Sequence, residues 1–190
     1  MLLKIRLWCL LCAVVFIASC AGSSVYMRSS EKLLNPTNDK ALVRFMRPSG
    51  YGTAINFNIL DGEKVIGNSV AESQFDYLAD PGKHLFIVAS GNKVFLEADL
   101  EAGKTYYVIT RVHTGAWYAR VTLDPVNRGS EWWDKVNEYE STLQRLKADT
   151  TALKIWEEIN KRKIKKIIFA YESLWKDQHQ WPKLMPEDGR

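Results

Sequence analysis

The stretch HLFIVASGNKVFLEADLEAGKTYYVITRV, residues 84–112, decides the fold of this chain. It contains three short runs rich in β-branched and aromatic residues, separated by Gly91-Asn92 and by Ala102-Gly103. In the middle run Val94, Leu96 and Ala98 alternate with other residues, among them Glu97 and Asp99. Alternation with a period of two, interrupted by turn-forming residues, is typical of antiparallel strands that bury one face. The stretch therefore predicts three short strands joined by turns.

The same pattern extends in both directions, from Lys40 to Val126. Asp61-Gly62 is a hairpin signal, and Asp80-Pro81-Gly82 is a turn sequence. Seven or eight short strands at this spacing predict a mainly β protein with an antiparallel, immunoglobulin-like sandwich. The run 84–89 is almost wholly apolar, so we expect it to be a central strand that is covered on both faces. The expected strands are 41–47, 54–60, 64–68, 74–78, 84–89, 93–100, 105–112 and 116–123.

Beyond Pro125 the apolar residues follow a helical period, which predicts a C-terminal pair of α-helices. Ser130 is the expected cap of the first helix, and Asp149-Thr150-Thr151 the expected cap of the second, which runs to about Trp175. Each helix carries an apolar stripe. The stripes either pack on each other or on the sandwich, or one of them is exposed and binds a partner protein. Their residues are Trp132, Val136, Tyr139, Leu143 and Leu146, and then Trp156, Ile159, Ile164, Ile167, Ile168, Tyr171 and Trp175.

A basic cluster lies within the second predicted helix. It is either a solvated helix face, paired in part through Glu157–Lys161 and Glu158–Arg162, or a surface that contacts anionic lipid headgroups or other envelope polyanions. It is the candidate surface contact of this chain. Its residues are Lys161, Arg162, Lys163, Lys165 and Lys166.

The first twenty residues resemble a bacterial lipoprotein signal peptide. Lys4 and Arg6 precede an uncharged apolar stretch, residues 7–18, which is short for a transmembrane helix. The sequence Ile17-Ala18-Ser19-Cys20 that ends it resembles the lipobox of bacterial lipoproteins. In that family the Cys receives a diacylglyceryl group and becomes the first residue after cleavage, so Cys20 is the expected lipid attachment site. The alternatives are ordinary signal cleavage nearby and an uncleaved anchor.

The residues around Cys20 add to this interpretation. Cys9 and Cys12 would be removed with the signal peptide. Cys20 would then be the one cysteine left in the mature chain, so no intramolecular disulfide could form. Ala21 follows it, and in the enteric sorting rule that this resembles, a residue other than Asp at this position directs a lipoprotein to the outer membrane. We therefore expect a chain held by lipid at the outer membrane and facing the periplasm.

Three motifs of the β region carry a further resemblance. They are 41–48 (ALVRFMRP), the segment from Tyr77-Leu78 through Asp80-Pro81-Gly82-Lys83-His84, and 100–108 (LEAGKTYYV). Together they resemble a family of short bacterial lipoprotein domains of unknown function, related to the immunoglobulin-like or PEGA-like sandwiches of envelope proteins. The resemblance covers under half of the chain and implies a fold and a location. It implies no active site.

The composition of the chain and the spacing of its chemically active residues argue against several classes of protein function. The chain has 190 residues and a net charge of +4, from 26 Lys and Arg against 22 Asp and Glu, which is too mild an excess for a nucleic-acid binder. His84, His113 and His179 have no metal-ligand spacing, and there is no phosphate-binding loop or nucleophile elbow. We therefore expect no enzyme, no metal and no cofactor.

The predicted organisation is a signal peptide (1–19), a lipidated tether (20–39), a β-sandwich (40–127), a helical extension (128–178) and a tail (179–190). The expected function is a non-enzymatic, lipid-anchored envelope protein that serves as a binding or structural module. One alternative is an accessory subunit of an envelope machine that docks a partner through its C-terminal helices. Another is a glycan-binding module with an aromatic surface, and the residues considered for it are Tyr51, Tyr107, Trp117, Tyr118, Trp132 and Trp133.

Overall fold

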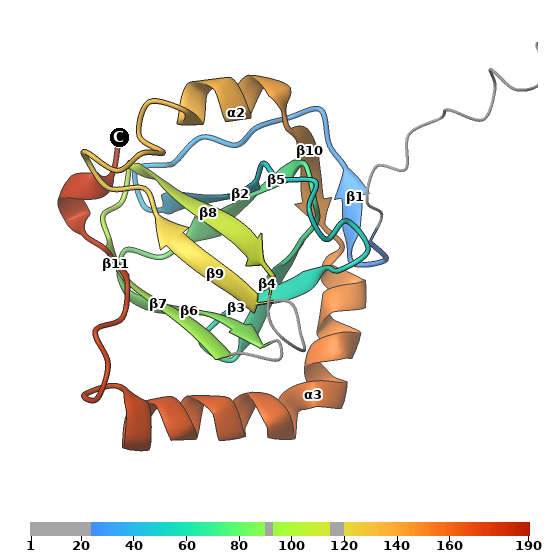
Figure 1. Cartoon of the computed structure of the whole chain (residues 1–190), viewed down its shortest axis with the longest axis vertical. Coiled ribbons are helices and arrows are strands. Elements are labelled where there is room, and N and C mark those ends of the chain that lie inside the picture. Colours follow the sequence, from blue (N-terminus) through green and yellow to red (C-terminus); the bar gives the residue numbers. More distant parts are fainter. Residues whose placement is uncertain (1–23, 90–92, 115–119) are drawn as a thin grey trace, which may run out of the picture.

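The computed structural model describes residues 24–89, 93–114 and 120–190 of the chain. In this part, two β-sheets pack face to face, with a helix on the outer side of each sheet (Figure 1). The strands are β1 (Met27–Ser29), β2 (Ala41–Arg47), β3 (Phe57–Asp61), β4 (Lys64–Ser69), β5 (Ser73–Ala79), β6 (Gly82–Ala89), β7 (Lys93–Leu100), β8 (Thr105–His113), β9 (Arg120–Pro125), β10 (Gln144–Ala148) and β11 (Lys183–Leu184).

The prediction of a mainly β chain is confirmed, but the number of strands and their directions differ from it. The first sheet has the order β1-β10-β5-β2-β8-β9, and the second has the order β11-β7-β6-β3-β4. The described residues form eleven strands rather than seven or eight, because β1, β10 and β11 extend the two sheets at their edges. The sheets are also mixed rather than antiparallel, since β2 pairs with β8, β5 with β10 and β7 with β11 in parallel.

The main hydrophobic core lies between the two sheets, where the alternation in the sequence places it. Phe45 of β2 stacks on Phe75 of β5 and meets Phe86 of β6 edge to face, with ring centroids 5.1 and 5.3 Å apart. Strand β6 is covered on both faces, as its apolar sequence predicts. Its Phe86 and Val88 belong to the central core, whereas Ile87 packs on the other side.

Two smaller cores join helices to the outer faces of the sheets. Helix α2 (Val136–Thr142) covers the first sheet, where Val136 packs near Met46 and Ile109. Helix α3 (Thr150–Ala170), which continues into the π-helical turn η1 (Tyr171–Trp175), covers the second sheet. Figure 1 shows α3 first beside β4 and then along the outside of β6 and β7. Both predicted apolar stripes therefore pack mainly on the sandwich, and the two helices lie on opposite sides of it.

The first predicted helix is much shorter than expected, and Ser130 does not cap it. Helix α2 starts only at Val136, after turns that place Trp132 and Trp133 against the first sheet. It ends at Thr142, where the Ser141 and Thr142 hydroxyls donate hydrogen bonds to the Glu138 carbonyl. Such side-chain bonds compete with helix continuation.

Strand β10 replaces the rest of that predicted helix. Its residues favour helix on their own, but here they fill the place between β1 and β5, where Leu146 pairs with Phe75. Backbone pairing with two strands and partial burial of Leu146 against the central core override the local propensity. The second helix follows the prediction closely, since the Asp149 carboxylate accepts a hydrogen bond from the Ala152 N–H at 3.1 Å.

The segments on either side of the sandwich are ordered against it wherever the structure describes them. In the expected tether, β1 pairs with β10, and the Leu34 N–H donates to the Asp76 carboxylate at 2.6 Å. In the expected tail, β11 pairs with β7, and the backbone of Arg190 exchanges two hydrogen bonds with Thr105. Within residues 24–89, 93–114 and 120–190, no helix combines the length and apolar character needed to cross a membrane.

Gly67 of β4 gives a test of this packing. A Cβ at this position would lie 2.4 Å from the ring of Phe75, which is buried and stacked on Phe45 and so has no room to move. We expect Gly67→Ala to lower the free energy of unfolding by about 1–3 kcal/mol in urea denaturation. The control is Gly50→Ala, whose Cβ would meet only the end of the Glu72 side chain. Equal stability of the two variants would contradict this packing.

Candidate functional site

The basic cluster predicted from the sequence lies on α3, and all five of its side chains are exposed. Lys161 forms an ion pair with Glu158 at 3.5 Å, and within the described part of the chain the other four have no acidic partner. The expected pairs Glu157–Lys161 and Glu158–Arg162 do not form. Glu157 turns inward instead, where its carboxylate accepts a hydrogen bond from the Val65 N–H at 2.8 Å.

The same solvent face of α3 also carries large apolar side chains. The opposite face packs on the second sheet through Leu153, Ile164 and Ile167. Three residues nevertheless point outward: Ile155, Ile159 and Phe169 are 59%, 78% and 71% exposed. Ile159 was expected on the packed stripe, so its exposure is a correction. The outer face of α3 thus combines free cations with exposed apolar groups, and we call these eight residues (the three apolar residues and the five of the basic cluster) the α3 outer face.

The N-terminal segment reaches the fold beside the first turn of α3. The Asp149 N–H donates to the Tyr26 carbonyl at 2.8 Å, and Arg28 forms an ion pair with the Asp149 carboxylate at 2.9 Å. Cys20 lies outside the described residues, four positions before Ser24. The structure therefore places the start of the described chain next to the helix that carries the basic cluster.

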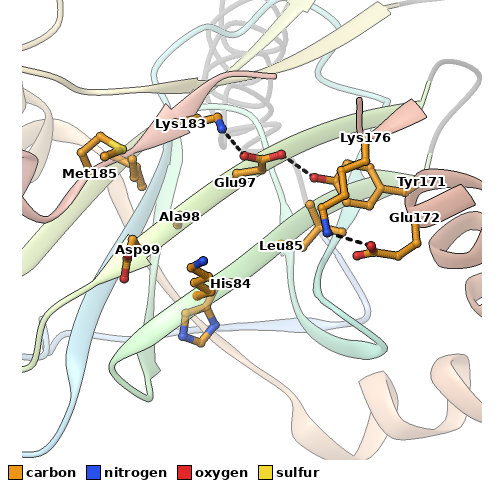
Figure 2. Close-up of a pocket in the computed structure, with 12 residues that line it drawn as sticks. His84, Leu85, Glu97, Ala98, Asp99, Tyr171, Glu172, Lys176, Lys183 and Met185 are labelled. Carbon is orange, nitrogen blue, oxygen red and sulfur yellow. Dashed lines mark hydrogen bonds and ion pairs between the residues drawn. The ribbon is translucent and has the colours of Figure 1, made fainter. Parts of the chain in front are cut away.

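A pocket of about 460 Å³ opens between β6, β7, β11 and the π-helical turn η1 (Figure 2). In it the Glu97 carboxylate accepts hydrogen bonds from the Tyr171 hydroxyl at 2.5 Å and the Lys183 ammonium at 2.7 Å. Burial raises the pKa of Tyr171, as does the Glu97 carboxylate. Burial also acts to raise the pKa of Glu97, but the hydrogen bonds from Lys183 and Tyr171 outweigh it and hold this pKa below its usual value. Sequence reasoning did not identify this pocket, because its residues come from four separate segments.

Most of the charged side chains that line this pocket pair with one another. Lys176 pairs with Glu172 at 2.8 Å, as Lys183 does with Glu97. Lys83 and Asp99 are register partners on the adjacent strands β6 and β7. Three lysines and three carboxylates thus line the pocket, together with His84, which is bound to Asp61 outside the lining. Its polar groups hold η1 and β11 against β7, which is a structural task.

His84 belongs to a second polar cluster, at one end of the central core. Its Nδ1 lies 2.8 Å from the Asp61 carboxylate, and its Nε2 lies 2.8 Å from the Asp80 carbonyl. Both neighbours are acceptors, so both ring nitrogens must carry protons for both bonds to form. The hydrogen bond with Asp61 raises the pKa of His84 above its usual value. Tyr77 of the first sheet donates to the same carboxylate at 2.9 Å, so the cluster connects the two sheets.

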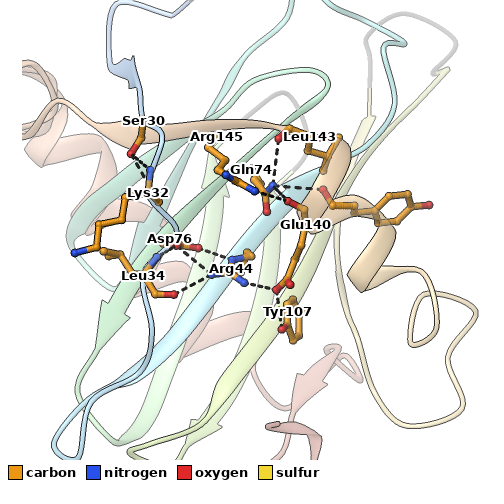
Figure 3. Close-up of polar contacts among 11 residues, drawn as sticks. Ser30, Lys32, Leu34, Arg44, Gln74, Asp76, Tyr107, Glu140, Leu143 and Arg145 are labelled. Carbon is orange, nitrogen blue, oxygen red and sulfur yellow. Dashed lines mark hydrogen bonds and ion pairs between the residues drawn. The ribbon is translucent and has the colours of Figure 1, made fainter.

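A third cluster is centred on Arg44, on the outer side of the first sheet (Figure 3). Its guanidinium pairs with Asp76 at 2.6 Å, with Glu140 of α2, and with the Leu34 carbonyl at 3.0 Å. The Tyr107 hydroxyl donates to Glu140 at 2.9 Å, and burial together with this bond raises the pKa of Tyr107 to about 12. Every charge in this cluster faces a partner, as is typical of buried polar networks that stabilise a fold.

The aromatic residues considered for glycan binding do not form one surface. Tyr107 is buried, and Trp133 is covered by the Arg190 guanidinium, 3.8 Å from its ring centroid. Trp132 packs nearby, but Tyr51 lies in the loop after β2, where its hydroxyl contacts Thr114. Trp117 and Tyr118 lie outside the described residues.

The described residues contain no group of three or more metal-ligating side chains. His113 ends β8 and contacts Thr122 at 3.3 Å, and His179 stacks on Trp181. Comparisons with protein-family models, with curated proteins and with solved structures found no match for this chain. The function is therefore argued from the sequence and the geometry alone.

The His84 cluster predicts a pH dependence of stability. A raised pKa in the folded state means that the stabilising effect is complete below the unfolded value of about 6.5 and is lost as the pH rises through the folded value. We expect the free energy of unfolding to fall by roughly 1–2 kcal/mol between pH 6 and the pH at which His84 has lost its proton in the folded state. In urea titrations at several pH values, His84→Gln should abolish this fall in the free energy of unfolding, whereas His179→Gln should retain it. An identical pH slope in both variants would contradict the charged imidazole.

The Arg44 cluster predicts a large effect of a single substitution. Arg44→Met removes the cation and leaves Asp76 and Glu140 facing each other without it, so the free energy of unfolding should fall by about 3–5 kcal/mol. The matched control is Arg111→Met, which breaks the more exposed pair with Asp124 and should cost at most about 1 kcal/mol. Thermal or urea unfolding of the two variants checks the ranking, and a smaller loss for Arg44→Met would overturn it.

Proposed function

We propose that this chain is a non-enzymatic, lipid-anchored protein of the bacterial envelope that serves as a binding or structural module. The observation that carries the proposal is Ile17-Ala18-Ser19-Cys20 at the end of a short apolar stretch preceded by Lys4 and Arg6. A thiol at this place is the group that takes a diacylglyceryl chain in the lipoproteins that this sequence resembles. Two acyl chains hold a protein stably at a membrane without a spanning helix.

Ala21, directly after the proposed attachment site, favours the outer membrane and a module that faces the periplasm. The geometry supports a role in binding or structure rather than catalysis. The shifted titratable groups Glu97, Tyr171 and His84 are each engaged by neighbours from other strands or helices, and these contacts hold the fold together. A catalytic group needs a reactive atom left free to meet a substrate.

A second candidate is an accessory subunit of an envelope machine that docks a protein through α3. The exposed Ile155, Ile159 and Phe169 favour it, because apolar groups gathered on one helix face often mark a contact surface. A glycan-binding module is the third candidate. The coverage of Tyr107 and Trp133 speaks against an aromatic platform at that place.

The anchor is tested by expressing the full chain in a bacterial host with radiolabelled palmitate. We expect the wild-type chain to incorporate the label and to fractionate with membranes, and Cys20→Ala to lose the label. Cys12→Ala is the matched control, since it removes a thiol from the apolar stretch and should leave labelling unchanged. Labelling that survives Cys20→Ala would exclude the proposed attachment site.

A further inference from the structure

We propose that the α3 outer face lies on an anionic lipid surface, in the same membrane to which Cys20 would attach the chain. The proposal rests on the proposed function for the position of the anchor, and on the described structure for everything else. The contact would hold the sandwich in a fixed orientation, with the second sheet toward the lipid and α2 on the far side (Figure 1).

The first argument is the distribution of charge. Helix α3 carries six Lys and Arg against two Glu, so its net charge equals the +4 of the entire chain. Residues 20–127, which include β1–β9, contain 11 basic and 11 acidic residues. Of the two helical carboxylates, Glu157 is bound to the Val65 N–H and Glu158 to Lys161. The cations of the α3 outer face are thus concentrated on one helix and largely uncompensated there. Each Lys or Arg near an anionic bilayer strengthens binding.

The second argument is the mixture of residue types on this face. The basic cluster lies along the helix between Ile159 and Phe169, so exposed apolar side chains flank the cations at both ends. Cores of protein–protein interfaces are depleted in Lys, because each ammonium would have to be desolvated. At a lipid surface the same mixture is favourable, since apolar side chains enter the headgroup region while the Lys and Arg heads stay among the phosphates. The composition therefore favours lipid over protein as the occupant.

The third argument is the length of chain between the anchor and the fold. Four residue steps separate Cys20 from Ser24, and a fully extended chain covers at most about 14 Å over that distance. Tyr26 is hydrogen-bonded to Asp149, which is the N-cap of α3. Ten residues of helix, about 15 Å, lead from there to Ile159. A lipid on Cys20 would therefore bring the membrane surface to the start of α3, with the outer face within reach.

The test uses the full chain, purified in detergent and reconstituted into two kinds of vesicle. One contains phosphatidylcholine alone, and the other contains phosphatidylcholine with 40 mol% phosphatidylglycerol. Hydroxyl-radical footprinting then measures the oxidation rates of Phe169 and of Tyr51, which are both more than half exposed but lie on different parts of the molecule. We expect Phe169 to be oxidised at least fivefold more slowly on the anionic vesicles than on the neutral ones, with Tyr51 unchanged within twofold.

Two charge variants complete the design. The first combines Arg162→Gln, Lys163→Gln, Lys165→Gln and Lys166→Gln, and it should lose the protection of Phe169. The second removes four exposed cations outside α3, through Lys32→Gln, Lys83→Gln, Arg120→Gln and Arg128→Gln, and it should keep the protection. Glutamine forms helix about as well as Lys and Arg do, so the first variant should retain its fold. The four control residues are exposed and lie outside helices, so their replacement should leave the fold intact as well. Equal behaviour of the two variants would overturn the proposal.

Flotation separates failure of the anchor from failure of the surface contact. Binding to pure phosphatidylcholine vesicles depends on lipid at Cys20, whereas protection of Phe169 on anionic vesicles depends on the α3 outer face. A chain that floats with both vesicles but leaves Phe169 equally reactive on both overturns the lipid contact and retains the anchor. That result would instead favour a protein as the occupant. Protection of Phe169 without flotation on phosphatidylcholine would support the contact and overturn the anchor.

Discussion

The guanidinium of Arg44 is the interaction on which the arrangement of the outer segments depends. It lies at the centre of the first sheet, and its partners come from β5, from α2 and from the segment before β2, through Asp76, Glu140 and the Leu34 carbonyl. Gln74, on the neighbouring strand, donates to three carbonyls at the end of α2, those of Tyr139, Glu140 and Leu143. Because a buried cation is costly without partners, these segments must fold together with the sheet. This single requirement positions α2, fixes the end at which β10 begins, and orders the chain that leads from β1 to β2.

The sandwich itself follows from local sequence, whereas its edges do not. All eight expected strands overlap with a strand of the structure, and two of them, β2 and β7, have the expected bounds. Alternation and turn residues act within a few positions, so they can be read directly. Strands β1, β10 and β11 have two to five residues and no alternation of their own. They exist because an edge strand of the sandwich offers unpaired backbone groups, and which segment fills that place is decided by distant contacts such as Leu146 with Phe75.

The α3 outer face was predictable only in part, because local sequence patterns reveal some of its features and distant packing decides the others. The basic cluster is continuous in sequence, and its place on α3 follows from the helical period. The exposure of Ile159 does not follow, because the apolar residues of α3 cover more of its circumference than one sheet can bury, and only the packing of Leu153, Ile164 and Tyr171 decides which side is inside. The sequence shows Arg44 as a cation that shares one face of its strand with the apolar residues Leu42 and Met46. Its partners were not visible, since Glu140 lies almost a hundred residues away and in a helix whose extent was overestimated.

The three polar clusters belong to a part of the molecule that is held by internal contacts, whereas α3 presents a face that is free to interact. The acids near Arg44, His84 and Glu97 are bound to cations or hydroxyls within the fold, which leaves them little affinity for a ligand. The cations of the α3 outer face, apart from Lys161, have no such partner in the described chain, and the apolar side chains beside them gain nothing from water. A folded chain keeps such a combination exposed at a cost in solubility, because apolar patches on a helix promote association. This cost is offset if the α3 outer face stays in contact with a surface that has anionic groups outside and an apolar layer a few ångströms beneath them. A bilayer is such a surface, and a short link from Cys20 would keep α3 against it.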